Sequence, residues 1–376
     1  MESGISFSSD PTITFFSNGP VRKEALDPIV AEAERRGYDT VFEEDLSAEA
    51  EVGIYNEHTY RIQEVNAALS VIGFHSIDCP YKGDHWIGEP WDQFDIGFVP
   101  GAATGEKWVR NSWYPKARPD IGLFEVGWPK SDDVFSDSFQ QRLEAIRTEY
   151  RVPEGSSVMF TPSYPSTEKL REFLSATEKY DNRLVKLHPS HNNREIAQGV
   201  KTDDVIFLDE NKKIMECLSI ADVSVSDESS VIQESILTGT IPVSVTDWMI
   251  GSNRDKKPSA RMPGFAIQTP RSNLGSTLSS LVDDLEAHRE QLLEQRDHHF
   301  ANVGSSAAVA MDVIEAVIHD DPLPVAPLEP EYSLPAHIYG IARANVVDHT
   351  PEALKDVLRR SGTERVLQYI DDRSIR

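Results

Sequence analysis

The sequence predicts an α/β protein with two doubly wound domains, each built on a parallel sheet. Short β-rich runs alternate with helical stretches from residue 12 to about 320, as crossover helices between parallel strands require. The 376 residues are enough for two domains of roughly 150 residues each. The turn Pro153-Glu154-Gly155 divides the alternation into two series. We therefore expect domains at 1–152 and 153–320 and a separate segment at 321–376.

The first series opens with a strand at Thr12–Ser17, which the turn Asn18-Gly19-Pro20 ends. A helix at 21–36 follows, because its apolar residues recur on one face. Helical spacing of Val65, Leu69 and Ile72 predicts another helix at 62–72. The other elements predicted here are strands at 40–42, 52–55, 96–99 and 121–126 and a helix at 139–150.

The second series repeats the pattern. Its predicted strands are at 157–161, 184–187, 205–208, 223–226 and 241–246. Its predicted helices are at 167–180, 212–220, 230–237, 274–295 and 307–318. Two such halves place their ligand site in the cleft between them, beyond the carboxyl ends of the strands.

The segment from 321 onward has a different composition. Asp320–Pro335 holds five prolines among acidic residues, which predicts an extended linker. Residues 351–370 have the pattern of short amphipathic helices. We expect this arm to dock on the body of the protein or on another subunit in an oligomer.

Charge and composition exclude several classes of protein. The chain has 62 acidic and 37 basic residues, a net charge of −25, which argues against nucleic-acid binding and a polybasic membrane anchor. Cys79 and Cys217 lie far apart, so neither a disulfide scaffold nor a zinc site is expected. The chain also lacks P-loop, G-x-G-x-x-G and H-E-x-x-H motifs. No metal or cofactor is predicted.

The same composition predicts the cellular location of the protein and the kind of organism it comes from. No apolar run reaches the ~20 residues of a membrane span, and the first residues lack the basic start of a signal peptide. We expect a cytoplasmic protein. Evenly distributed acidity suits a halophilic source, because concentrated salt screens the repulsion between like charges.

The strongest local signal for a site is the segment Ala221–Glu234. A β-rich run ends at Asp227, and Ser229-Ser230 opens a helix whose free backbone N–H groups can bind an anion such as phosphate. Glu234, one turn further, can accept a hydrogen bond from a ribose hydroxyl. The alternative is that Ser229 is only the N-cap of the helix.

Histidines are the other candidates. His188 follows a predicted strand at the cleft, where it can contact phosphate or act as an acid, or else be an ordinary loop histidine. In the first half, His75 can deprotonate a hydroxyl, with Lys82 near a phosphate. His58 and His85 flank His75, so the residues themselves leave the base open.

Five segments, in this order, resemble motifs of the CDP-glycerol glycerophosphotransferase family of teichoic acid synthesis. They are Gly73-Phe74-His75-Ser76 with Lys82, Gly127-Trp128-Pro129-Lys130-Ser131-Asp132, Phe160-Thr161-Pro162-Ser163-Tyr164, Lys186-Leu187-His188-Pro189, and Ala221-Asp222 with Ser226-Asp227-Glu228-Ser229-Ser230 and Glu234. The likeness covers about residues 50–310. Among the departures, Lys130 replaces an arginine, and Glu228 replaces a tyrosine.

The resemblance implies a GT-B fold with the nucleotide donor held mainly by the second domain. It implies that His75 is the base and that His188 and the 227–230 turn contact the donor phosphates. Thr161, Lys130 and Glu234 complete the implied donor site. It further implies a CDP-linked donor and, as acceptor, a glycan or a lipid-linked molecule at the inner face of the membrane.

Two other functions remain open at this point. A nucleotide-sugar glycosyltransferase of the same fold would form a glycoside rather than a phosphodiester. A non-catalytic nucleotide-binding scaffold would bind a donor without turnover and act through its C-terminal arm.

Overall fold

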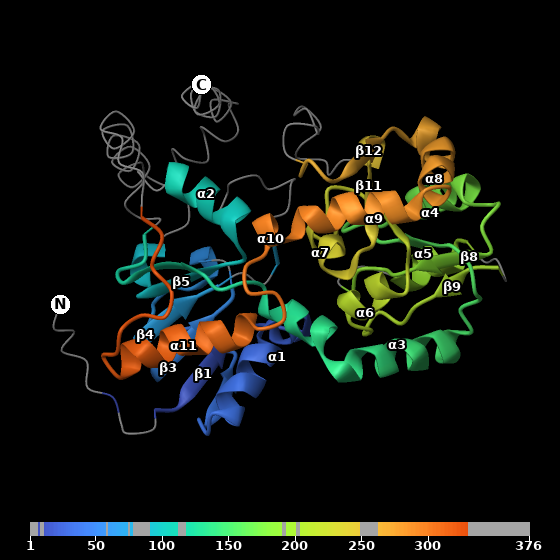
Figure 1. Ribbon diagram of the computed structural model, residues 1–376. Coiled ribbons are helices and arrows are strands. Elements are labelled where there is room, and N and C mark those ends of the chain that lie inside the picture. Colours follow the sequence, from blue (N-terminus) through green and yellow to red (C-terminus); the bar gives the residue numbers. More distant parts are fainter. Residues whose placement is uncertain are drawn as a thin grey trace, which may run out of the picture.

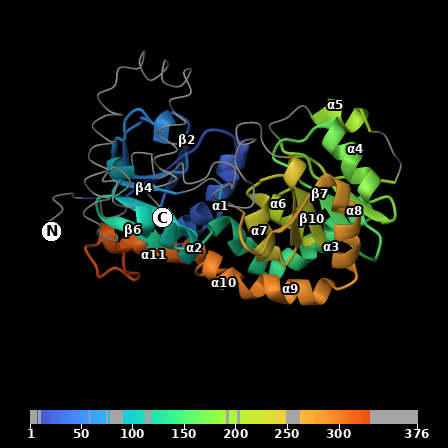
Figure 2. The same ribbon diagram turned by 90° about the horizontal axis from the view of Figure 1, so that it is seen from above.

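The structure is a computed structural model that describes residues 7, 11–57, 59–73, 76–77, 91–111, 118–189, 193–200, 204–248 and 262–329. Two α/β domains lie side by side in both views (Figure 1, Figure 2). The predicted site residues His75 and Lys82, the alternatives His58 and His85, and the arm beyond residue 329 lie outside the described residues.

The first domain contains a six-stranded parallel sheet in the order β2-β1-β3-β4-β5-β6. Its strands are β1 Ile13–Phe16, β2 Thr40–Glu43, β3 Ala50–Tyr55, β4 Ala67–Ile72, β5 Ile96–Val99 and β6 Gly122–Glu125. Its helices are α1 Pro20–Arg35, η1 Thr59–Arg61, η3 Trp91–Gln93 and α2 Ala102–Asn111. Every residue of β1 is buried, as expected where a parallel sheet is covered on both faces.

Two segments connect the sheets. The 3₁₀ segment η5 (Pro129–Phe135) and helix α3 (Asp137–Tyr150) lead from the first domain to the second. The chain returns through α10 (Arg296–His299), which lies between the two domains in Figure 1.

The second domain has a parallel sheet in the order β12-β11-β10-β7-β8-β9. Its strands are β7 Ser157–Phe160, β8 Asn182–Val185, β9 Ile206–Phe207, β10 Val223–Ser226, β11 Ile241–Val245 and β12 Ile267–Thr269. The helices are α4 Thr167–Ala176, α5 Asn193–Gln198, α6 Ile214–Ser219, α7 Val231–Thr238, η6 Thr246–Trp248, η9 Arg271–Asn273, α8 Leu274–Val282 and α9 Leu285–Glu294. The sequence analysis did not predict α2, α5 or β12.

Two of the predicted helices were wrong in detail. Residues 67–72, assigned to a helix at 62–72, form strand β4 between β3 and β5. A central strand buried on both faces lacks the apolar–polar alternation that distinguishes a strand from a helix, and Ala67-Ala68-Leu69 has high helix propensity. The single helix predicted at 274–295 is two helices, α8 and α9, separated at Asp283-Asp284.

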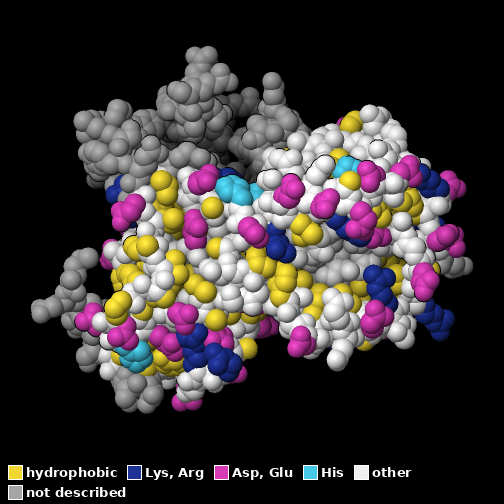
Figure 3. Space-filling view, in the orientation of Figure 1, with side chains coloured by type: hydrophobic (Ala, Val, Ile, Leu, Met, Phe, Trp, Pro, Cys, Tyr) yellow, Lys and Arg dark blue, Asp and Glu magenta, His cyan; other side chains and the backbone are white. Residues whose placement is uncertain are grey.

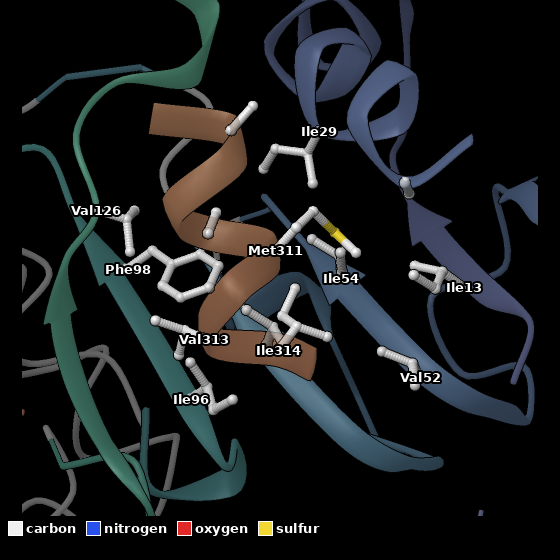
Figure 4. Packing of buried hydrophobic residues seen from close by; sticks show 14 of the residues in the cluster. Ile13, Ile29, Val52, Ile54, Ile96, Phe98, Val126, Met311, Val313 and Ile314 are labelled. Atoms are coloured by element: carbon white, nitrogen blue, oxygen red, sulfur yellow. The ribbon is translucent and has the colours of Figure 1, made fainter. Parts of the chain in front are cut away.

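Helix α11 (Ser306–Ile318) returns to the first domain, although the predicted boundary placed it in the second. Its apolar face, with Met311, Val313 and Ile314, packs on the first sheet against residues such as Ile54 and Phe98 (Figure 4). Asp132 accepts hydrogen bonds from the first backbone N–H groups of α11, Ser306 at 3.0 Å and Ala307 at 2.7 Å. The last helix of the chain therefore completes the core of the first domain.

An apolar cluster joins the two domains. Trp128, from the end of the first domain, packs with Met215 of α6 and Ile236 of α7, and Phe300 of the returning segment is in the same cluster. This cluster is an apolar contact between the two domains.

Candidate functional site

The carboxyl edge of the second sheet is organised around Asp227, which directly follows β10. Its side chain is completely buried and accepts hydrogen bonds from the backbone N–H groups of Ser163 (2.9 Å) and Tyr164 (3.1 Å). The ammonium group of Lys169, in α4, lies 3.3 Å from the same carboxylate. These contacts tie the loop after β7 to the loop after β10.

Ser229 continues this network toward α7. Its Oγ accepts a hydrogen bond from the hydroxyl of Ser163 at 2.8 Å and another from the backbone N–H of Val231 at 3.3 Å. Ser229 therefore accepts a hydrogen bond from one N–H group of the first turn of α7, although it is not the N-cap residue that the capping interpretation predicted. Ser230 is the N-cap by backbone position and makes no side-chain cap bond, so its hydroxyl is the group that remains available at this helix start.

Thr161 and His188 lie on the neighbouring strands of the same edge, because β7 is between β10 and β8. Thr161 is almost fully buried, and its Oγ1 has no hydrogen-bond partner among the described residues. His188 is half-buried, and its backbone carbonyl accepts a hydrogen bond from the side chain of Asn193 at 3.1 Å. The strand order thus brings Thr161, His188 and the 227–230 turn to one edge.

Lys186, two residues before His188, is a buried cation that sequence reasoning did not assign. Its ammonium group donates to the backbone carbonyl of Glu210 at 2.8 Å. Burial lowers the pKa of Lys186. No local pattern distinguished this lysine from a surface residue, because its burial depends on the packing of β8 and the loop after β9.

The cleft is crossed by an ion pair between the remaining two predicted residues. Lys130 Nζ in η5 lies 3.2 Å from Glu234 Oε1 in α7, with side-chain exposures of 10% and 4%. Burial by itself lowers the pKa of Lys130, but the negative charges of Glu234 and Glu24 outweigh it and raise the pKa overall. Lys130 is therefore charged, and it links η5 to α7 of the second domain.

Glu24, on α1, is a further acidic group at this junction. Burial raises its pKa, and the charge of Lys130 acts in the opposite direction. Glu24 and Lys130 line a cavity of about 520 Å³ together with Lys213 and Glu216 of the second domain. Sequence reasoning missed Glu24 because only the packing of α1 against η5 brings it to the cleft.

Two other kinds of site are absent from the described part of the chain. No cluster of three or more His, Cys, Asp or Glu residues there has the geometry to hold a metal ion. None of the helices in the described ranges is both long enough and apolar enough to span a bilayer.

Comparison with known proteins agrees with the motif resemblance. Residues 112–238 match the family described as CDP-Glycerol:Poly(glycerophosphate) glycerophosphotransferase. This range contains the described predicted site residues, from Lys130 to Glu234. The comparison with curated protein sequences found no match.

Solved structures share the fold. The wall teichoic acid polymerase TagF is 15% identical, with a TM-score of 0.61, over 85% of this chain and 91% of that chain. A TagF variant soaked with CDPG is 16% identical, with a TM-score of 0.60, over 85% and 91%. UDP-GlcNAc 2-epimerase from Neisseria meningitidis is 10% identical, with a TM-score of 0.55, over 81% of this chain and 99% of that chain. The predicted GT-B-like fold of two doubly wound domains is confirmed.

Proposed function

From its resemblance to the CDP-glycerol glycerophosphotransferases, we propose that this protein transfers glycerol phosphate from a CDP-linked donor to a hydroxyl group. The acceptor is a glycan or a lipid-linked molecule. The observation that carries the proposal is the family match over residues 112–238, which coincides with the polar edge of the second sheet.

The arrangement of this edge supports donor binding there. The 227–230 turn is held by hydrogen bonds to the loop after β7, so the N-terminus of α7 is preorganised to receive a phosphate group. His188 lies on the same edge and can donate to a phosphate oxygen when protonated. Lys130, across the cleft, adds a buried positive charge that can stabilise the diphosphate.

The proposed reaction is a phosphoryl-group substitution. His75 removes the proton from the acceptor hydroxyl, whose oxygen attacks the phosphorus that carries glycerol. A new phosphodiester bond forms, the diphosphate bond breaks, and CMP leaves with the electron pair. The roles of His75 and Lys82 rest on the motif resemblance alone.

The first test is release of CMP from CDP-glycerol by the purified full-length chain, at low and at multimolar salt. Because the acidic surface favours a halophilic source, we expect release to be faster in concentrated salt. UDP- and GDP-sugars serve as competing donors. Release of UDP or GDP instead of CMP would replace the proposal by a glycosyltransferase, and donor binding without any turnover would favour the scaffold.

A variant separates catalysis from binding. His75→Ala should lower turnover at least about a hundredfold, because general base catalysis contributes about 10²–10⁴-fold. Binding of CDP-glycerol should stay within about twofold of wild type. His319→Ala, at an exposed position just after α11, is the matched control and should change neither quantity. Equal loss of binding and turnover in His75→Ala would contradict its role as the base.

The same proposal has consequences for where the enzyme meets its acceptor. A lipid-linked acceptor requires peripheral contact with the inner face of the cell membrane, and residues 321–376 are the proposed docking or oligomerisation arm. Deleting 330–376 should leave CMP release from soluble acceptors within about twofold while weakening association with vesicles or the oligomer.

A further inference from the structure

The loop that carries His188 lies at the outer side of the second sheet. His188 comes shortly after β8, and the edge strand beside β8 is β9, which has two residues. Both residues of β9 are half-buried, and the ladder pairs each of them with one residue of β8. Because so short a ladder contributes few backbone hydrogen bonds, the position of the next loop, 208–213, depends on side-chain contacts.

Lys186 fixes one point of that loop. It is 6% exposed, and its ammonium group donates to the backbone carbonyl of Glu210 at 2.8 Å and to that of Leu187 at 3.4 Å. A buried ammonium group requires acceptors of this kind, because burying a charge without hydrogen bonds is costly. The bonds from Lys186 therefore hold the main chain of Glu210 close to the end of β8.

Asn193, the first residue of α5, connects the same loop to His188. Its Nδ2 donates to the carboxylate oxygen Oε2 of Glu210 at 2.7 Å and to the backbone carbonyl of His188 at 3.1 Å. A side-chain amide nitrogen has two N–H donors, so each acceptor can receive one of them. The carboxylate only accepts, and its charge strengthens the bond and determines which way the amide group faces. Asn193 therefore bridges the two loops.

Lys186, Glu210 and Asn193 together form a clamp on the main chain of His188. Glu210 is held at its backbone by Lys186 and at its carboxylate by Asn193. A carboxylate near an edge that binds phosphate raises the electrostatic cost of binding an anion, so its presence requires an explanation. Its hydrogen bond to Asn193 supplies one, because that bond orients the amide group that holds His188.

The clamp acts on the direction of the His188 side chain. The carbonyl of His188 belongs to the peptide bond with Pro189, and a proline restricts the backbone of the residue before it. Because the peptide bond is planar, holding the carbonyl also holds the plane from which the His188 side chain departs. A side chain that recognises a ligand must be kept within about 0.5 Å of its productive position.

We propose that Asn193 and Glu210 are positioning residues that hold His188 in place for the donor diphosphate. The inference rests on the proposed function, in which His188 contacts that diphosphate. Neither positioning residue touches the donor. Glu210 orients the amide of Asn193, and Asn193 holds the carbonyl of His188. Loss of either side chain should therefore weaken donor binding only through His188.

The test is a double-mutant cycle on the full chain, with CDP as the probe and cytidine as its counterpart without phosphate. Calorimetry gives the dissociation constant of each. Asn193→Ala and His188→Ala should each raise the constant for CDP about tenfold, as expected for one hydrogen bond to a charged group, and leave that for cytidine within about twofold. In the double variant the loss should remain about tenfold, because no His188 side chain is left to position. Asn211→Ala, at an exposed position beside Glu210, is the matched control and should change neither constant.

Two variants of Glu210 separate positioning from charge. Glu210→Gln keeps an oxygen that accepts from Asn193 and should bind CDP within about twofold of wild type, whereas Glu210→Ala should weaken CDP binding about fivefold. Removal of a negative charge would by itself strengthen CDP binding in both variants. Tighter binding in Glu210→Ala would therefore overturn the positioning role of Glu210. Losses that multiply to about a hundredfold in the double variant of Asn193 and His188 would overturn the inference, since Asn193 would then act independently of His188.

These outcomes are distinguishable from failure of the proposed function. If wild type binds CDP and the cycle is non-additive, but no CMP is released from CDP-glycerol, the positioning role stands and the proposed transfer fails. If CMP is released and Asn193→Ala binds CDP as wild type does, the transfer stands and the positioning role fails.

Discussion

The carboxyl edges of the two sheets differ in how their loops are tied together, although each edge holds a buried hydroxyl, of Thr161 or of Ser17, that has no hydrogen-bond partner among the described residues. At the second edge, Asp227 accepts two backbone hydrogen bonds and pairs with Lys169, and Ser229 bonds Ser163 and the start of α7. At the first edge, the hydroxyl of Ser17 is buried without a hydrogen bond among the described residues.

The difference lies in how many contacts depend on one side chain. The second edge contains a hydrogen-bonded network around Asp227 and Ser229, in which the loss of either side chain breaks several contacts. At the first edge, the buried hydroxyl of Ser17 takes part in no hydrogen bond among the described residues, so removing it breaks none of them. Substitutions within the network of the second edge should therefore lower the free energy of unfolding more than removal of the Ser17 hydroxyl does.

The largest effect is expected at the second edge. Asp227→Ala removes a buried carboxylate and leaves two backbone N–H groups and the Lys169 ammonium without it. The free energy of unfolding should fall by about 4 kcal/mol, the range for breaking a buried ion pair. Urea unfolding at pH 7 measures it, with the exposed Asp297→Ala as control. A loss as small as that of the control would show that the network around Asp227 contributes little to stability.

The second largest effect is expected for the ion pair between Lys130 and Glu234. Lys130→Met leaves Glu234 buried without its cation and should cost about 3 kcal/mol of unfolding free energy. Glu234→Leu in the same background should recover part of this loss, since it removes the unpaired carboxylate. A double-mutant cycle by urea unfolding should give a coupling energy of about 1–3 kcal/mol. Additive losses would mean that the pair does not join the two domains energetically.

The smallest effect is expected in the pH dependence of stability. It arises from His299 in α10, the segment that leads back from the second domain to the first. His299 stacks edge-on against Phe265 of the second domain, with ring centroids 4.9 Å apart. Burial first, and the nearby charges of His298 and Lys107 second, lower the pKa of His299 from 6.5 to about 4. The neutral ring is favoured in the folded state, so its contribution to stability is present above pH 6.5 and is lost as the pH falls toward 4.

Wild type should therefore lose about 2 kcal/mol more unfolding free energy than His299→Gln between pH 7 and pH 4. Urea unfolding over this pH range measures the difference, and the exposed His319→Gln should follow wild type. Parallel pH profiles for wild type and His299→Gln would contradict the burial of this ring at the junction.

Most of the fold was predictable because local patterns determine it. Strands β1, β5, β10 and β11 and helix α1 follow from apolar runs, turn residues and helical periodicity, which act over a few residues. Strand β4 was not predictable in this way. Its residues suit a helix, and only its place between two other buried strands makes it a strand.

The candidate site likewise has one part that local sequence patterns predict and another that they do not. The sequence by itself determined that polar residues follow the strands of the second domain, and hence that Thr161, His188 and the 227–230 turn share an edge. Only the tertiary structure decided that Lys130 pairs with Glu234, that Glu24 lines a cavity with Lys130, and that Ser17 is buried. The physical reason is distance along the chain. Lys130 and Glu234 are 104 residues apart, and their contact depends on how two complete domains pack, which no local pattern encodes.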